Sequence, residues 1–115
     1  MGSVGTERGS VGRSVEAAIK NVEKNPIEVS KEEADDIKAA TYGLATGRLS
    51  DADKQKLISL VGKKRDINAG KTVQVSLAKL SKEGLKDMIR ITSKIGSTAS
   101  TFAMEDAFKL LSYKR

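Results

Sequence analysis

Helix-start and helix-stop signals divide this chain into short segments, and they constrain its fold more than any other feature of the sequence. Ser30, Ser50 and Ser81 each precede a run of helix-forming residues. A serine in that position can cap a helix, because its oxygen accepts a free backbone N–H of the first turn. Gly62 and Gly96 stand where the glycine that ends a helix is usually found. These signals predict a mainly α protein built from several short helices.

The spacing of apolar residues indicates where these helices lie. In the first of them, Val15, Ala18, Ile19 and Val22 follow the steps of three and four that are typical of an amphipathic helix, and Pro26 closes it. The second and third helices are expected to pack as an αα-hairpin. The predicted helices cover residues 13–24, 31–44, 51–61, 82–95 and 101–113, the last of them capped by Ser100 or Thr101.

Residues 71–77 interrupt the helical pattern and predict a strand. Val73, Val75 and Leu77 alternate with polar residues, so all three would lie on one side of an extended segment. The same stretch also fits a helical stripe that continues into the residues after it. The main prediction is therefore a strand followed by the helix at 82–95. One long helix within an all-α helical bundle is the alternative.

The chain divides into three parts on this basis. Residues 1–12 contain the tetrapeptide Gly-Ser-Val-Gly twice. A segment so rich in glycine is expected to form a flexible arm, because ordering it costs much backbone entropy. A helical region that contains the αα-hairpin follows at 13–65, and a strand-helix-helix unit covers residues 71–115.

The amino-acid composition excludes the catalytic and metal chemistry that depends on His or Cys. The 115 residues include no His and no Cys. A Ser/His/Asp triad, a thiolate nucleophile and a Cys/His zinc site are therefore excluded. The tripeptide Gly70-Lys71-Thr72 matches the end of a phosphate-binding P-loop, but Arg65 occupies the position of its first glycine. We expect no catalytic residues, no metal ligands and no cofactor, and hence a protein that is not an enzyme.

Membrane-spanning and secretory segments are not visible in the sequence. Residues 1–12 are polar, and the longest strongly apolar stretch, at 57–61, is interrupted by Ser59. We therefore expect no membrane partner, and a location in the cytoplasm or within a particle assembled there.

The net charge of +6 is concentrated toward the C-terminal end. By formal count, residues 1–30 are neutral, residues 31–70 carry +1 and residues 71–115 carry +5. A positive surface attracts polyanions such as nucleic acids, anionic membranes or acidic proteins. Solubility alone is the alternative explanation for this charge.

The C-terminal part resembles the ribbon-helix-helix family of DNA-binding dimers. The resemblance lies in the order of four stretches: an alternating strand at 72–77, a helix at 82–95, a glycine-containing turn at 96–100 and a second helix at 101–111. It implies that two copies of the chain pair their strands into an antiparallel ribbon, which enters the major groove of DNA.

The resemblance also implies which residues contact DNA. Thr72, Gln74 and Ser76 would face outward and contact bases, while the apolar residues between them lie in a core shared by the two copies. Backbone N–H groups near Ser100 and Thr101 would hold a phosphate. Sequence-independent contacts with phosphates are expected from Lys63, Lys64, Arg65, Lys71, Lys79 and Lys94.

These features together predict a non-catalytic DNA-binding protein that acts as a homodimer in a regulatory, partition or replication-accessory role. The local excess of positive charge and the strand-helix-helix order support this prediction. The alternative is a small structural protein of a virus particle or of another large assembly, or a helical inhibitor that docks on a partner protein.

Overall fold

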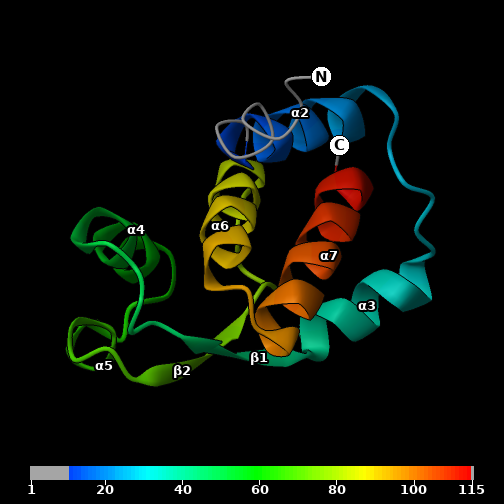
Figure 1. Cartoon of the computed structure of the whole chain (residues 1–115). Helices are drawn as coiled ribbons and strands as arrows, with labels where there is room; N and C mark the ends of the chain where they lie inside the picture. Colours follow the sequence, from blue (N-terminus) through cyan, green and yellow to red (C-terminus); the bar gives the residue numbers. More distant parts are fainter. Residues whose placement is uncertain (1–10, 115) are drawn as a thin grey trace, which may run out of the picture.

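The computed structural model describes residues 11–114, with side chains from residue 14 onward, and most of the predicted arm at 1–12 lies outside that range. Within it the chain forms six helices and one two-stranded sheet (Figure 1). The protein is therefore mainly α, as the sequence predicts. The elements in chain order are α2 (Val11–Lys24), α3 (Lys31–Ala39), β1 (Thr41–Ala45), α4 (Asp51–Val61), α5 (Lys64–Asn68), β2 (Thr72–Ser76), α6 (Lys82–Ile95) and α7 (Thr98–Tyr113).

Serine caps and terminal glycines explain why two helices begin and end where the sequence predicts. Ser30, Ser50 and Ser81 cap α3, α4 and α6, and each side-chain oxygen accepts the backbone N–H of the residue three positions later, at 3.0–3.1 Å. Gly62 and Gly96 follow α4 and α6 with φ of 76° and 74°, which glycine adopts without steric cost. The predicted bounds of α4 and α6 are confirmed.

The largest difference from the sequence prediction is a strand at Thr41–Ala45, where a continuous helix over 31–44 was expected. β1 pairs antiparallel with β2, which is the predicted strand. The pairing buries Tyr42 and Leu44, which are 7% and 0% exposed, and Thr41, Tyr42 and Gly43 are weak helix formers, so the segment extends. The αα-hairpin is therefore wrong, because β1 separates α3 from α4. The single long helix is wrong as well, because β2 is extended.

Two helix starts also differ from the prediction. A helix of five residues that is not among the predicted helices, α5, forms at Lys64–Asn68. α7 begins at Thr98, three residues before the predicted start, because Ser97 caps it. Ser97 and Ser100 each accept the backbone N–H of the other through their hydroxyl oxygens, at 3.1 and 2.9 Å. Several hydroxyl residues near this position could cap the helix. The reciprocal capping box explains why Ser97 is the residue that does.

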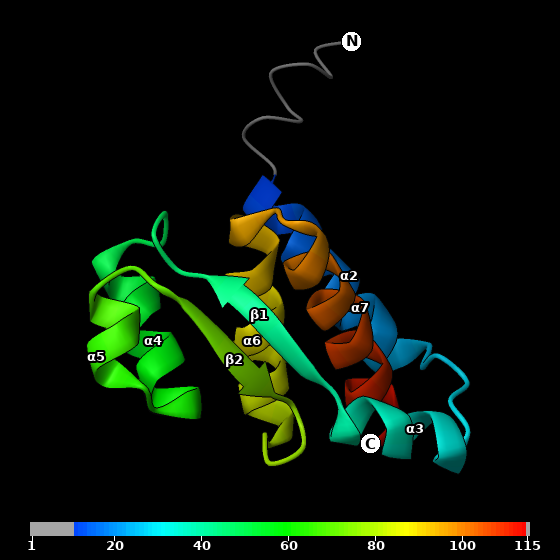
Figure 2. The ribbon, with the colours of Figure 1, turned by 90° about the horizontal axis from the view of Figure 1, so that it is seen from below.

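The ribbon formed by β1 and β2 lies against the helical layer of α6 and α7. In Figure 2 it crosses in front of α6, with α4 and α5 on one side and α3 on the other. Its inner side chains join one hydrophobic cluster with residues of the helices. Leu44, Leu85, Met88, Ile89 and Leu110 in this cluster are all 0% exposed. The outer face of the ribbon is thus presented on a rigid helical support.

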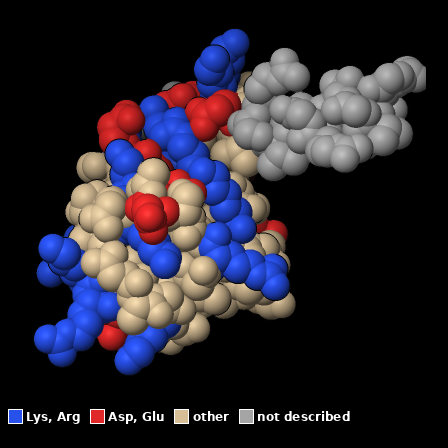
Figure 3. All heavy atoms as spheres, turned by 60° about the vertical axis from the view of Figure 1, so that its left-hand side comes forward, with Lys and Arg blue, Asp and Glu red and all other residues tan. Residues whose placement is uncertain are grey.

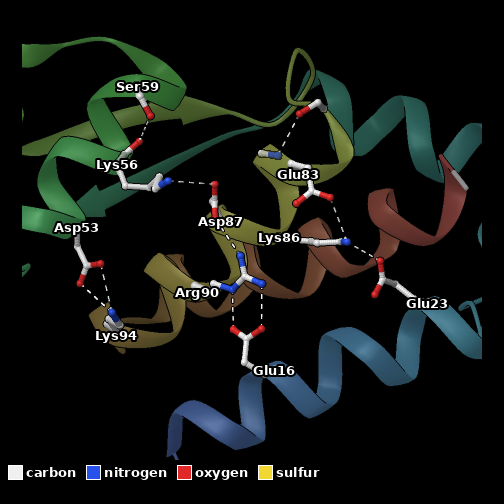
Figure 4. A network of polar contacts seen from close by, with 12 residues as sticks. Glu16, Glu23, Asp53, Lys56, Ser59, Glu83, Lys86, Asp87, Arg90 and Lys94 are labelled. Carbon is white, nitrogen blue, oxygen red and sulfur yellow. Dashed lines mark hydrogen bonds and ion pairs between the residues drawn. The ribbon is translucent and has the colours of Figure 1, made fainter.

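Ion pairs fasten α2 to α6 at the edge of this core (Figure 4). Arg90 donates two hydrogen bonds to the carboxylate of Glu16, at 2.6 and 2.9 Å, and these bonds hold the pKa of Glu16 below its ordinary value. The Nζ atom of Lys86 lies 2.6 Å from a carboxylate oxygen of Glu23. Ile19 of α2 is buried in the core nearby. The cations of α6 are therefore neutralised where α2 covers them.

Replacing Thr46 with Val is expected to lower the free energy of unfolding by about 1–2 kcal/mol. Thr46 is 0% exposed, and its hydroxyl donates a hydrogen bond of 2.7 Å to the carbonyl oxygen of Lys71, which joins the turn after β1 to the start of β2. Valine has the same shape but leaves that carbonyl without this donor. Urea unfolding measures the change. Thr101→Val is the matched control, because Thr101 is exposed and should change stability by less than about 0.5 kcal/mol.

Candidate nucleic-acid interface

The outer face of the ribbon is small, uncharged and exposed. The predicted residues Thr72, Gln74 and Ser76 are all exposed on this face, while Val73 and Val75 between them are 3% and 2% exposed. The register places three β1 residues beside them, with Thr41 opposite Ser76, Gly43 opposite Gln74 and Ala45 opposite Thr72. The alternation predicted from the sequence is thus confirmed for β2.

Gly43 leaves room for the side chain of Gln74 on this face. A Cβ atom at position 43 would lie 3.0 Å from the Nε2 atom of Gln74, closer than real Cβ atoms normally approach another atom. The amide of Gln74 therefore extends across the ribbon toward β1. An amide in this position can present both a donor and an acceptor to a ligand above the sheet.

Positive charge gathers around the ribbon, and no salt bridge within the described residues neutralises it. Residues 62–80 contain five basic side chains and one acidic side chain, Asp66. Figure 3 brings the α4 and α5 side of the molecule forward and shows Lys and Arg around its lower part, with little Asp or Glu. Among residues 14–114, salt bridges involve other cations of the chain. Six exposed basic residues near the ribbon form no such salt bridge. We term them the ribbon cations: Arg48, Lys63, Lys64, Arg65, Lys71 and Lys79.

Arg48 is the member of this set that sequence reasoning missed. It lies in the turn after β1, at a position that was expected to follow a helix. Gly47 packs closely against Gly70, since a Cβ atom on Gly70 would lie 3.3 Å from the Gly47 Cα atom. This contact brings the turn that carries Arg48 to the loop that carries Lys71. Only the pairing of β1 with β2 reveals this proximity.

Three of the predicted phosphate contacts are not part of this surface. The ammonium group of Lys94 lies 3.0 Å from Asp53, so its charge is already paired. Ser100 is 0% exposed, and its N–H bonds to the hydroxyl of Ser97. The N–H of Thr101 bonds to the Ser97 carbonyl oxygen at 2.9 Å. The predicted phosphate grip at residues 100 and 101 is therefore wrong, because α7 begins one turn earlier and uses both donors.

A groove between α4 and β2 brings four of the predicted residues together. Lys63, Gln74, Ser76 and Lys79 all line it, and it encloses about 460 Å³. Leu60 and Val61 at the end of α4 form part of its opposite wall. We refer to this feature as the α4–β2 groove. It joins the outer face of the ribbon to two of the ribbon cations.

Replacing Lys63 with Gly is expected to stabilise the protein by about 0.5–1 kcal/mol, because a left-handed conformation costs a non-glycine residue about 1–2 kcal/mol, part of which the greater freedom of unfolded glycine offsets. Lys63 has φ of 58°, the one positive value for a non-glycine residue within the described part of the chain. Urea unfolding measures the effect. Lys64→Gly, one residue later within α5, is the control and should destabilise instead. A loss of stability from Lys63→Gly would contradict the expected strain.

Tyr42 of the ribbon has a raised pKa, and its role is structural. Burial and a hydrogen bond of 2.6 Å to Asp106 raise the pKa of Tyr42. The phenol therefore stays protonated and ties β1 to α7.

In the described residues, no group of three His, Cys, Asp or Glu side chains could hold a metal ion.

Comparison of the chain with protein-family models, with curated proteins and with solved structures finds no match. None of the helices in residues 11–114 combines the length and the apolar character needed to cross a membrane. The exposed surface of the ribbon and its charges are therefore the basis for a functional proposal.

Proposed function

We propose that the protein binds duplex DNA without catalysis, through the outer face of the β1–β2 ribbon and the ribbon cations around it. The observation that carries the proposal is an uncharged, exposed ribbon surrounded by cations that form no salt bridge with any described residue. A two-stranded ribbon is narrow enough to enter the major groove of B-form DNA. Cations beside it would meet the phosphates on either side.

One chain supplies both strands of this ribbon. The ribbon-helix-helix resemblance implies one strand from each of two copies, whereas here β2 pairs with β1 of the same chain. A single copy therefore presents a complete two-stranded surface. The homodimer stays a prediction from the sequence, and DNA binding through the ribbon does not require it.

The side chains on the ribbon favour duplex DNA over single strands. Proteins that bind single strands stack bases on exposed aromatic side chains. The outer face carries none: Tyr42 points into the core, and Phe102, Phe108 and Tyr113 belong to α7. Gln74 can instead make a bidentate contact with adenine, and the neighbouring hydroxyl groups can bond several bases.

Fluorescence anisotropy with a labelled duplex and a labelled single strand of equal length tests this proposal. We expect the duplex to bind more tightly. If all six ribbon cations contact phosphates, the logarithm of the binding constant should fall with the logarithm of salt concentration with a slope of about −5. Absence of duplex binding at about 50 mM salt, or tighter binding of the single strand, would refute the proposal.

Gln74→Ala is expected to relax sequence preference without abolishing binding. A duplex selected from a random library supplies the preferred site, and unrelated sequence of the same length supplies the reference. The variant should lose about 1–3 kcal/mol of preference for the selected duplex while its affinity for the reference stays nearly the same. Lys64→Ala is the control and should weaken both duplexes similarly. Equal losses on both duplexes from Gln74→Ala would mean that Gln74 does not contact bases.

A further inference from the structure

The α4–β2 groove lies between α4 and the C-terminal part of β2, and Thr41 of β1 lines it as well. Within the described residues the sheet has two strands, so β2 has a pairing partner on one side only. Three consecutive β2 residues, Gln74, Val75 and Ser76, line the groove. The side chain of Val75 faces the core and the residue is 2% exposed, so the main chain of β2 borders the groove at this point. An uncovered strand edge offers N–H and C=O groups to another extended chain.

The walls of the groove suit an extended peptide. Leu60 and Val61 of α4 are half-buried on one side, and Ala78 and Leu80 lie on the other. When a peptide adds to a sheet edge, its main chain bonds to the edge strand and its alternate side chains enter pockets beside it. Small apolar side chains of such a peptide would cover these walls.

The charge at the rim of the groove specifies the peptide further. Lys63 stands at the α4 wall and Lys79 at the β2 wall, and both are exposed without a salt bridge to any described residue. Among the described residues, no acidic side chain lines the groove. Carboxylates of a bound peptide could therefore pair with both lysines.

We propose that the α4–β2 groove binds an extended acidic segment of a partner protein, which adds to the sheet as a strand along β2 and places carboxylates against Lys63 and Lys79. This proposal goes beyond DNA binding at the ribbon face and does not require it, although the groove shares Lys63 and Lys79 with the ribbon cations. The apolar walls favour a peptide over a nucleic acid strand in the groove. A second copy that paired its own β2 edge with this one would bring its own Lys63 and Lys79 to the site and meet like charge.

Selection from a phage-displayed library of random peptides against the full chain tests the proposal. We expect enriched peptides in which apolar residues alternate with other residues, two or more of them acidic. A synthetic copy of the most enriched peptide then serves as the probe in fluorescence polarisation. The double variant Lys63→Glu and Lys79→Glu should weaken the probe by more than about tenfold, because two attractive contacts become repulsive. Lys20→Glu with Lys24→Glu, exposed on α2, makes the same change in net charge and should have little effect.

Methylation of the probe's backbone nitrogens separates strand addition from simple charge attraction. In an added strand, every second N–H group of the peptide points to β2 and the others point away. Methylating the nitrogens that point to β2 should weaken binding by about tenfold or more, and methylating the others should not. Three results would overturn the proposal: no enriched peptide, full affinity for the Lys63→Glu and Lys79→Glu variant, or equal affinity of both methylated forms. Lys64→Glu with Arg65→Glu should weaken duplex DNA but not the probe, so each proposal can fail alone.

Discussion

Reversing the charges of Lys64, Arg65 and Lys71 together is expected to weaken duplex DNA binding by more than about a hundredfold near physiological salt. All three side chains are exposed beside the ribbon. Each would lose a phosphate contact and place a carboxylate near the DNA backbone. The salt dependence should become shallower as well, with the slope reduced by about 3, since three fewer counterions are released.

Anisotropy titrations of one duplex at several salt concentrations measure both effects. The matched control reverses Lys20, Lys24 and Lys82, which are exposed on α2 and at the start of α6 and change the net charge by the same amount. If the control weakens binding as much as the ribbon variant, the attraction comes from overall charge, and the ribbon cations are not the binding surface. Unfolding curves of both variants should stay close to the parent curve, because exposed substitutions of this kind change stability by about 0.5 kcal/mol or less.

The helices that the sequence predicts well are those whose ends depend on local contacts. The Ser50 and Ser81 oxygens each bond to an N–H three residues away. Gly62 and Gly96 adopt the positive φ that ends a helix. Nothing distant in the sequence is needed for these four features. The bounds of α4 and α6 could therefore be predicted from neighbouring residues alone.

The ribbon shows why the remainder of the fold could not be predicted in this way. Thr41 pairs with Ser76 across 35 positions of the chain, and β1 has only two buried apolar side chains, Tyr42 and Leu44. Two alternating residues are too short a pattern to compete with a helix signal that begins at a good cap. The strand exists because β2 supplies its hydrogen bonds and the helices supply the surface that buries it.

The candidate site also combines features set by neighbouring residues with features set by residues distant in the chain. The outward set of β2 follows from alternation, so Gln74 and its neighbours could be predicted. Whether a lysine or arginine is free to contact phosphate depends on partners elsewhere in the chain. Asp53, for example, pairs with Lys94 across 41 positions. Ser100 is lost from the site because α7 starts at a different hydroxyl residue than expected. The cations that remain are those that form no salt bridge with a carboxylate of residues 14–114.

Replacing Leu44 with Ala is expected to lower the free energy of unfolding by about 2–5 kcal/mol, the range found when a buried leucine is truncated without collapse of the site. Leu44 is 0% exposed and pairs with Val73 on the inner face of the ribbon. Because a domain of this size is stable by only about 5–15 kcal/mol, the change should be large in urea unfolding. Ala45→Ser, on the exposed side of the same strand, is the control and should have little effect.

This substitution also separates the strand from the helix that the sequence suggests. If residues 41–45 were the end of a helix with Leu44 exposed, Leu44→Ala would hardly change the free energy of unfolding, because alanine is the better helix former. In the ribbon it removes apolar contacts on which both strands depend. The outer face loses its geometry in the unfolded fraction, so duplex affinity measured at increasing urea concentration should fall along the unfolding curve of the variant. A variant that unfolds like its parent would show that β1 contributes nothing to the core.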